Sequence, residues 1–191
     1  PAFDSWNSGS NEGTPCTPFA CIEVQANRNG AASINTRITQ AQPTSWTNAN
    51  FFATLAEDYY NHPTLSPIDP NSDCQDNYII VVGDGDFTSG VNVGFEKIRQ
   101  LANRQNSPVQ TIPIAYGTGI SANGLAQFNL LAQTGGTGEA VVAESPSQLK
   151  ARLADIIRNI QADKLAFTAP AITSKVGEGG FLYQAQFQYR Q

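Results

Sequence analysis

The chain of 191 residues has no long apolar run and no concentration of basic side chains. No segment approaches the roughly 18 consecutive apolar residues of a membrane-spanning helix, so we expect no transmembrane segment. The net charge is −5 and lysine and arginine do not cluster, which disfavours binding to nucleic acid or to an anionic membrane surface. The length suits one well-buried domain with an appendage.

Histidine is almost absent, because His62 is the only one and it precedes a proline. A Ser-His catalytic pair or a histidine metal site would depend wholly on this residue, and we interpret it as a surface histidine. No nucleophile can be paired with a base, so we do not expect an enzyme. The segment Gly117-Thr-Gly-Ile-Ser121 lacks the lysine of a P-loop and the third glycine of a dinucleotide fingerprint, which disfavours phosphate binding.

Cysteine is also scarce. Cys16, Cys21 and Cys74 fit neither a thiolate metal site nor a dense disulfide scaffold. Cys16 and Cys21 are disulfide candidates because only a small loop separates them, and Cys74 is then buried or paired outside this segment. Only 14% of the residues are charged and uncharged polar residues are abundant, which favours an exported, extracellular protein. The chain starts at Pro1, and we expect a trimmed or excised piece of a longer polypeptide.

The strongest local pattern lies in residues 77–86, Asn-Tyr-Ile-Ile-Val-Val-Gly-Asp-Gly-Asp. Its five consecutive apolar residues predict a strand that is buried on both faces, as in a parallel sheet. Ligands of open α/β sheets bind at the carboxyl ends of such strands, which makes Asp84 the first candidate for contact with an ion or partner. The alternative is that Asp84 only caps the backbone of its own turn.

Helical and extended patterns alternate through the middle of the chain. Apolar periodicity predicts strands at residues 78–82, 109–116 and 140–143 and helices at residues 47–60 and 93–105, with two more helices after the caps Ser121 and Ser145. Thr47 is the expected N-cap of the first helix. This alternation predicts a doubly wound, mostly parallel α/β sheet.

The sequence patterns at the two ends of the chain differ from the α/β alternation in its middle. Residues 1–18 are loop-like, whereas residues 20–38 alternate around Asn27-Arg-Asn-Gly30 and predict an antiparallel edge hairpin. Residues 181–189 alternate apolar and polar side chains, which predicts a half-buried strand in a C-terminal β extension. We therefore expect an irregular segment at residues 1–19, an α/β domain at residues 20–163 and a β linker at residues 164–191.

Several of these features together resemble a von Willebrand factor type A domain over about residues 21–162. They are the helix opened by Thr47, the strand that ends in Gly83-Asp-Gly85, and the final amphipathic helix that follows a glycine pair. Four further stretches look like PilC/PilY-type tip proteins of type IV pili: Ser66-Pro-Ile68, residues 74–85, Ala166-Phe-Thr-Ala-Pro-Ala171 and Leu182-Tyr-Gln-Ala-Gln-Phe187.

The resemblance implies a non-enzymatic adhesion and assembly module at the tip of a type IV pilus, with a β-propeller domain after the linker. Its partners would be minor pilins or other pilus subunits, and a ligand on a host or abiotic surface. The implied location is extracellular, at the pilus tip or the bacterial cell surface. The alternative is a purely structural or mechanical module that positions or shields the propeller and binds no ion.

Domains of this family usually carry a metal-ion-dependent adhesion site. The resemblance assigns Asp84 and Thr47 to two of its ligands, with Mg²⁺, or alternatively Ca²⁺ or Mn²⁺, as the ion, because hard cations take oxygen ligands. The family's threonine before the aspartate is Gly83 here. Ser8 and Ser10 imitate the second half of the Asp-x-Ser-x-Ser motif, with Trp6 at the aspartate's position.

Two further expectations concern the same region. Asp86 and Thr88 lie in a short oxygen-rich loop that could hold Ca²⁺, although it lacks the glutamate of a full calcium loop, and the alternative is a solvated loop. The central strand of the family, with its complete motif, is not found. We expect the chain to begin downstream of that strand, so that an upstream segment, another polypeptide or a rearranged hairpin fills the gap.

Overall fold

The computed structural model describes residues 2–3, 22–24, 29–40, 47–72 and 75–165. The chain divides into two compact units, Pro1–Leu153 and Ala154–Gln191. The described elements are β1 (Ala2–Phe3), β2 (Ile22–Val24), α2 (Ala31–Gln40), α3 (Ala49–Asn61), β3 (Asn77–Gly83), α4 (Val91–Ala102), β4 (Val109–Tyr116), α5 (Ala122–Thr134), β5 (Val141–Ala143) and α6 (Pro146–Leu165).

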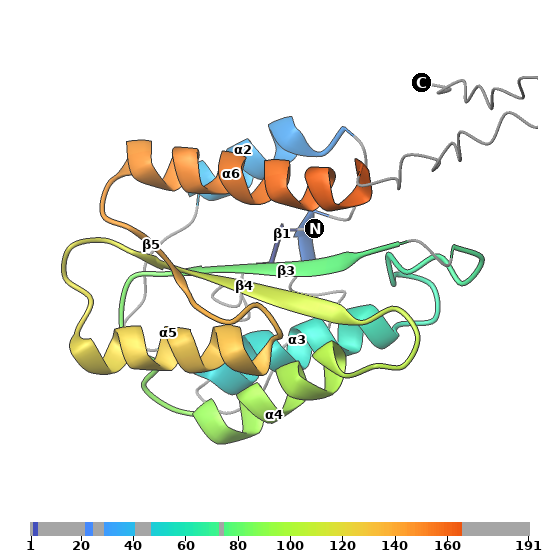
Figure 1. The fold of residues 1–191 in the computed structure, drawn as a ribbon, viewed down its shortest axis with the longest axis horizontal. Helices are drawn as coiled ribbons and strands as arrows, with labels where there is room; N and C mark the ends of the chain where they lie inside the picture. The colour runs from blue at the N-terminus through green and yellow to red at the C-terminus, as the bar shows by residue number, and fades with distance from the viewer. Residues whose placement is uncertain (1, 4–21, 25–28, 41–46, 73–74, 166–191) are drawn as a thin grey trace, which may run out of the picture. The chain divides into compact units, whose positions relative to one another are not determined.

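The strands β3, β4 and β5 form a sheet in that order, and all three are parallel. Asn77 pairs with Val109 and Ile114 pairs with Val141. Because strand order follows chain order and such crossovers are right-handed, α4 and α5 lie on the same face of the sheet, where α3 joins them (Figure 1). The predicted α/β class and parallel sheet are confirmed, and the arrangement is compatible with a Rossmann-like fold.

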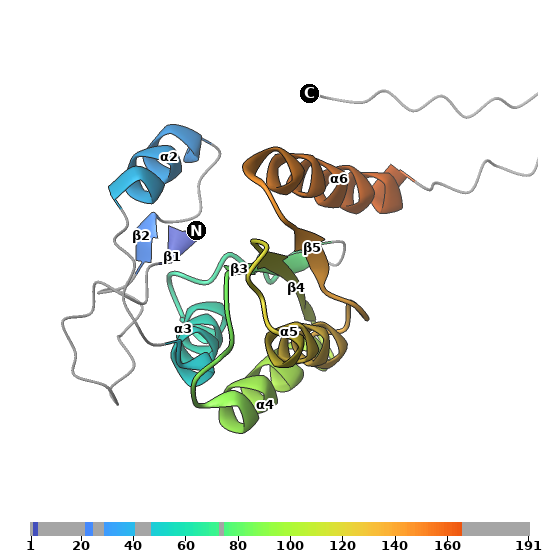
Figure 2. The ribbon, with the colours of Figure 1, turned by 90° about the vertical axis from the view of Figure 1, so that its left-hand side faces the viewer.

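The hydrophobic core lies between this face of the sheet and the helices α3, α4 and α5 (Figure 2). In α4, Phe95, Ile98 and Leu101 recur every three residues, so they share one face of the helix and are buried. Full burial of a side chain such as Ile98 stabilises the fold by about 1.5–3 kcal/mol.

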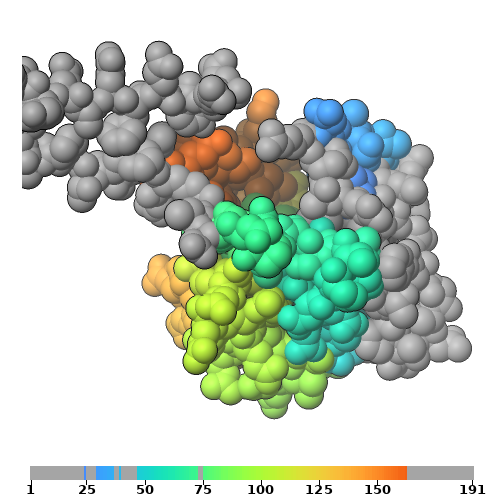
Figure 3. Space-filling view, turned by 90° about the vertical axis from the view of Figure 1, so that its right-hand side faces the viewer, coloured from blue at the N-terminus to red at the C-terminus, as the bar shows by residue number. Residues whose placement is uncertain are grey.

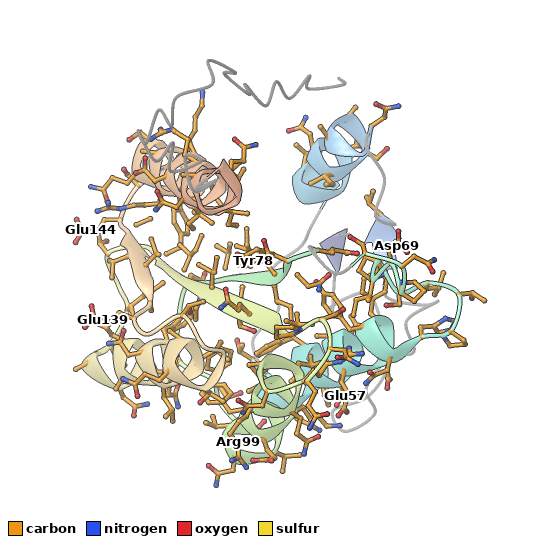
Figure 4. The ribbon with its side chains drawn as sticks, turned by 45° about the vertical axis from the view of Figure 1, so that its right-hand side comes forward. Glu57, Asp69, Tyr78, Arg99, Glu139 and Glu144 are labelled. Atoms are coloured by element: carbon orange, nitrogen blue, oxygen red, sulfur yellow. The ribbon has the colours of Figure 1, made fainter. Side chains whose placement is uncertain are left out.

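The helices α3 and α4 also contact each other at the surface (Figure 3). An ion pair between Lys97 of α4 and Glu57 of α3 joins them across this contact. Arg99, by contrast, points away from the sheet and pairs with Glu96 of its own helix (Figure 4). The pair of Lys97 and Glu57 therefore connects two elements, whereas the pair of Arg99 is local.

Within the part of the chain that the structure describes, the second face of β3 is only partly covered. Ile79 is 9% exposed, whereas the exposed fraction is 39% for Ile80 and 48% for Val82. Successive side chains of a strand point to opposite faces, and the three core helices cover only the face that holds Ile79. The prediction that this strand is buried on both faces is therefore wrong. Among the strands that the structure describes, only β4 pairs with β3.

The predicted N-terminal hairpin is wrong in its second arm. β2 pairs antiparallel with β1, so residues 1–18 also contain a short strand that was not expected. Residues 31–40 form α2, although the alternation up to residue 38 predicted an extended arm. The Ile34 amide donates to the Gly30 carbonyl at 2.9 Å and the Thr36 hydroxyl to the Ala32 carbonyl at 3.0 Å. Alanine at the start of this segment favours a helix, and Ala31, Ile34 and Ile38 also fit helical spacing.

Helix caps were predicted more accurately. Ser121 caps α5 as expected, because its side chain accepts a hydrogen bond from the Gly124 amide at 2.9 Å. The N-cap of α3 is Asn48 rather than the predicted Thr47, since the Asn48 side chain accepts from the Asn50 amide at 2.9 Å. None of the helices in the described ranges is long and apolar enough to cross a membrane.

Several predictions fall outside the described residues. They concern the metal candidates Ser8 and Ser10, the disulfide candidates Cys16 and Cys21, and Cys74, which was predicted to be buried or paired outside this segment. The β linker was predicted for residues 164–191, of which residues 166–191 lie outside the described ranges and the first two belong to α6.

Candidate functional site

Two loops meet at the carboxyl edge of the sheet, where β3 and β4 both end because they are parallel. The loop of residues 84–90 follows β3, and the loop of residues 117–121 leads from β4 into α5. Asp86 joins them. Its Oδ1 accepts a hydrogen bond from the Ser121 hydroxyl at 2.6 Å, and its Oδ2 accepts one from the side-chain amide of Asn123 at 2.9 Å.

Gly124 completes this contact, and we call Asp86, Ser121, Asn123 and Gly124 together the Asp86 clamp. A Cβ atom at residue 124 would lie 2.4 Å from Oδ1 of Asp86, so only glycine fits there without a shift. The Gly124 amide donates to Oγ of Ser121 at 2.9 Å. One hydroxyl therefore caps the helix and also donates to the carboxylate.

Hydrogen bonds within the clamp lower the pKa of the Asp86 carboxyl group. The Asn123 side chain makes the largest contribution, and the Ser121 hydroxyl and the Gly124 amide act in the same direction. Asp86 is therefore ionised at neutral pH, and both of its oxygens accept hydrogen bonds from α5 and its cap. Its observed role is to connect the two loops.

The other end of the loop is joined to the start of α3. The Thr88 amide donates to the Thr47 carbonyl at 2.8 Å, the Thr47 amide donates to Oγ1 of Thr88 at 3.1 Å, and Asn48 forms a parallel bridge with Ser89. Gly90 adopts φ +70°, and a Cβ there would lie 2.1 Å from Oδ1 of Asn48. Thr47 is thus bonded to the loop that begins with Asp84.

A buried phenylalanine fixes the middle of this loop. Phe87 stacks on Phe128 with ring centroids 5.3 Å apart and meets Phe95 edge to face at 5.6 Å. Its backbone amide donates to Oε1 of Gln127 at 2.8 Å. Phe128 also explains the glycine at the end of β3, since a Cβ on Gly83 would lie 2.8 Å from Cζ of Phe128.

Asp84 itself lies exposed on this fixed loop. Its carboxylate forms no hydrogen bond or ion pair with any residue that the structure describes. No cluster of three or more His, Cys, Asp or Glu side chains suited to a metal occurs in that part of the chain either. The oxygen atoms of Asp84 and Thr47 are of the kind that Mg²⁺, Mn²⁺ or Ca²⁺ prefers, but the described residues supply few of them.

Some residues of this edge could not be found from the sequence. Asn123 and Gln127 carry no motif, and their contacts with Asp86 and Phe87 join residues 37 and 40 positions apart. The Ser121 cap was the one available signal. His62 instead serves the turn after α3, where its Nδ1 accepts hydrogen bonds from the amides of Thr64 and Leu65 at 3.2 and 3.1 Å.

Comparisons of the chain with protein-family models, with curated proteins and with solved structures gave no match in any of the three. The functional interpretation therefore depends on the residues and on the geometry of the carboxyl edge.

Proposed function

We propose that this chain is a non-enzymatic adhesion and assembly module, a von Willebrand factor A-like domain of a PilC/PilY-type protein at the tip of a type IV pilus. It binds minor pilins or other pilus subunits, or a ligand on a host or abiotic surface, and acts outside the bacterial cell. The observation that carries the proposal is the position of Asp84, an exposed carboxylate on a loop that is fixed at three points.

Those three points are Asp86, Phe87 and Thr88, which connect the loop to α5, to the core and to the segment before α3. A loop held in this way loses little conformational freedom when a partner binds, so more of the contact energy is available for affinity. In this proposal Asp84 and Thr47 hold a hard divalent cation, Mg²⁺ or alternatively Ca²⁺ or Mn²⁺, which leaves a coordination position for an oxygen of the partner.

A second candidate function is a structural module that binds no ion. It is favoured by one observation, that both oxygens of Asp86 accept hydrogen bonds from Ser121 and Asn123 within the protein. The loop of residues 84–90 would then serve only to bond the end of β3 to α5 and to the segment before α3.

Binding to purified minor pilins separates these two functions. The wild type, Asp84→Ala and the control Asp58→Ala are compared with and without chelator, because Asp58 is an exposed aspartate on α3 away from the loop. We expect weaker binding for Asp84→Ala and in chelator, with Asp58→Ala unchanged. Binding that neither change affects would rule out the ion-bridged contact, and an absence of binding by the wild type would contradict the proposal.

A further inference from the structure

The Asp86 clamp contains one of the two Asn-Gly pairs of the chain, Asn123-Gly124; the other is Asn29-Gly30. In such a pair the glycine nitrogen can attack the side-chain carbonyl carbon of asparagine, because glycine has no Cβ to hinder the approach. The new C–N bond closes a cyclic imide and ammonia leaves. Water then opens the ring to aspartate or isoaspartate, so the reaction needs no enzyme, cofactor or oxidant.

The clamp itself requires this reactive pair. Asp86 approaches the backbone of α5 so closely that a Cβ at residue 124 would lie 2.4 Å from its Oδ1, so any residue other than glycine would displace the carboxylate from the clamp. Asn123 is required as well, because its side-chain amide donates to Oδ2 of Asp86 at 2.9 Å. The connection between the two loops therefore places an asparagine directly before a glycine.

The same contacts oppose the reaction. The Gly124 nitrogen must lose its proton to attack, but it donates that proton to Oγ of Ser121 at 2.9 Å. The negative carboxylate of Asp86 lies beside this nitrogen and disfavours a second negative charge there. The hydrogen bond from the Asn123 side chain to Asp86 and the helical backbone of α5 also restrain this side chain, which must turn toward the Gly124 nitrogen to react.

We propose that Asn123 is a guarded deamidation site, which the Asp86 clamp keeps unreactive and which reacts when the clamp opens. The product cannot restore the clamp. Aspartate at residue 123 places a carboxylate where a hydrogen-bond donor faced Asp86, and isoaspartate adds a backbone atom within the first turn of α5. Each opening of the clamp therefore carries a chance of permanent damage to the carboxyl edge. This inference does not depend on the proposed function.

Peptide mass spectrometry of the purified chain, incubated in mildly alkaline buffer, tests the proposal. The fractions of aspartate and isoaspartate at residues 29 and 123 are followed over time. Asn29 is exposed in the turn before α2 and lies outside the clamp, so it serves as the internal reference. We expect residue 123 to react more slowly than residue 29 in the wild type.

Two variants open the clamp, Asp86→Ala and Ser121→Ala, and each should raise the rate at residue 123 about fivefold or more, the factor for one hydrogen bond of about 1 kcal/mol. The rate at residue 29 should not change. Ser145→Ala is the matched control, because it removes a capping hydroxyl from α6 instead. A urea-unfolded sample gives the rate of the unprotected chain.

Three results would overturn the proposal. The first is equal reaction rates at residues 29 and 123 in the wild type. The second is an unchanged rate at residue 123 in both clamp variants. The third is acceleration of the reaction at both residue 29 and residue 123 in the clamp variants to the rate of the urea-unfolded chain. Global folding, and not the clamp, would then be what protects Asn123.

Discussion

The hydroxyl of Thr88 bonds both backbone groups of Thr47, accepting from the amide at 3.1 Å and donating to the carbonyl at 3.0 Å. These two threonines are 41 positions apart in the chain. Thr88 belongs to the loop after β3, which carries Asp84, and Thr47 belongs to the segment before α3. Their contact therefore brings together the two segments that contain the predicted ion ligands.

Thr88→Val should lower the free energy of unfolding by about 0.5–1.5 kcal/mol, the net value of a typical hydrogen bond. Valine keeps the shape of threonine and the bond from the backbone amide of residue 88 to the Thr47 carbonyl, but its side chain cannot bond the Thr47 backbone. Thr88→Ser retains the hydroxyl and should lose less. Urea unfolding curves of the two variants measure the difference, and equal midpoints would mean that the hydroxyl does not contribute.

Gly83→Ala should destabilise the fold by about 1–3 kcal/mol, as overpacking of a core does. The added methyl group would lie 2.8 Å from Cζ of Phe128. Phe128→Leu removes the conflicting ring atoms, so the double variant should be more stable than the sum of the two single effects predicts. A double-mutant cycle by chemical denaturation measures this coupling, and additive effects would contradict the contact.

Tyr60 should make the fold sensitive to alkali. Burial, with a smaller effect of Tyr59, raises the pKa of Tyr60 to about 12, and its hydroxyl donates to the Tyr78 carbonyl at 2.9 Å. The ordinary tyrosine pKa is about 10. Above pH 10 the unfolded chain therefore releases a proton that the folded chain keeps, and stability falls until the pH reaches the folded pKa.

The variant Tyr60→Phe isolates this effect. It should lose about 1 kcal/mol at neutral pH, where the hydrogen bond is lost, but its stability should fall less steeply above pH 10. Unfolding free energies of both proteins at several alkaline pH values give the comparison. Parallel curves for the wild type and Tyr60→Phe would show that Tyr60 is not responsible.

Thr111→Val should leave stability unchanged or raise it by up to about 1 kcal/mol, because a buried polar group without a partner carries a desolvation cost. Thr111 is fully buried in β4, and its hydroxyl has no hydrogen-bond partner among the residues that the structure describes. Thermal unfolding of the variant measures the change. A loss of more than about 1 kcal/mol would reveal a partner for this hydroxyl.

The central α/β alternation could be predicted from the sequence because each element carries its own signal. The bounds of β4, Val109–Tyr116, match the predicted strand, and the Ser121 cap is found as expected. The second hairpin arm, predicted up to residue 38, was assigned wrongly because its short apolar pattern fits both a strand and a helix. Thr47 and Asn48 are neighbouring residues with suitable oxygens, and local sequence does not decide which one caps α3.

Other features depend on contacts that no local pattern contains. The exposure of Ile80 and Val82 depends on what covers the second face of the sheet, and an apolar run does not report that. The bonds from Asp86 to Ser121 and Asn123 form only after the two crossovers bring the loops together. The candidate edge could therefore be located from the end of β3, but not the side chains that fix it.

Isothermal titration of the purified chain with Mg²⁺, Ca²⁺ and Mn²⁺ tests most directly whether the carboxyl edge holds an ion through Asp84. We expect saturable binding of one of these cations to the wild type, its loss in Asp84→Ala, and its retention in the control Asp58→Ala. Absence of binding to the wild type, or equal binding to the wild type and Asp84→Ala, would contradict an ion-dependent adhesion site at this edge.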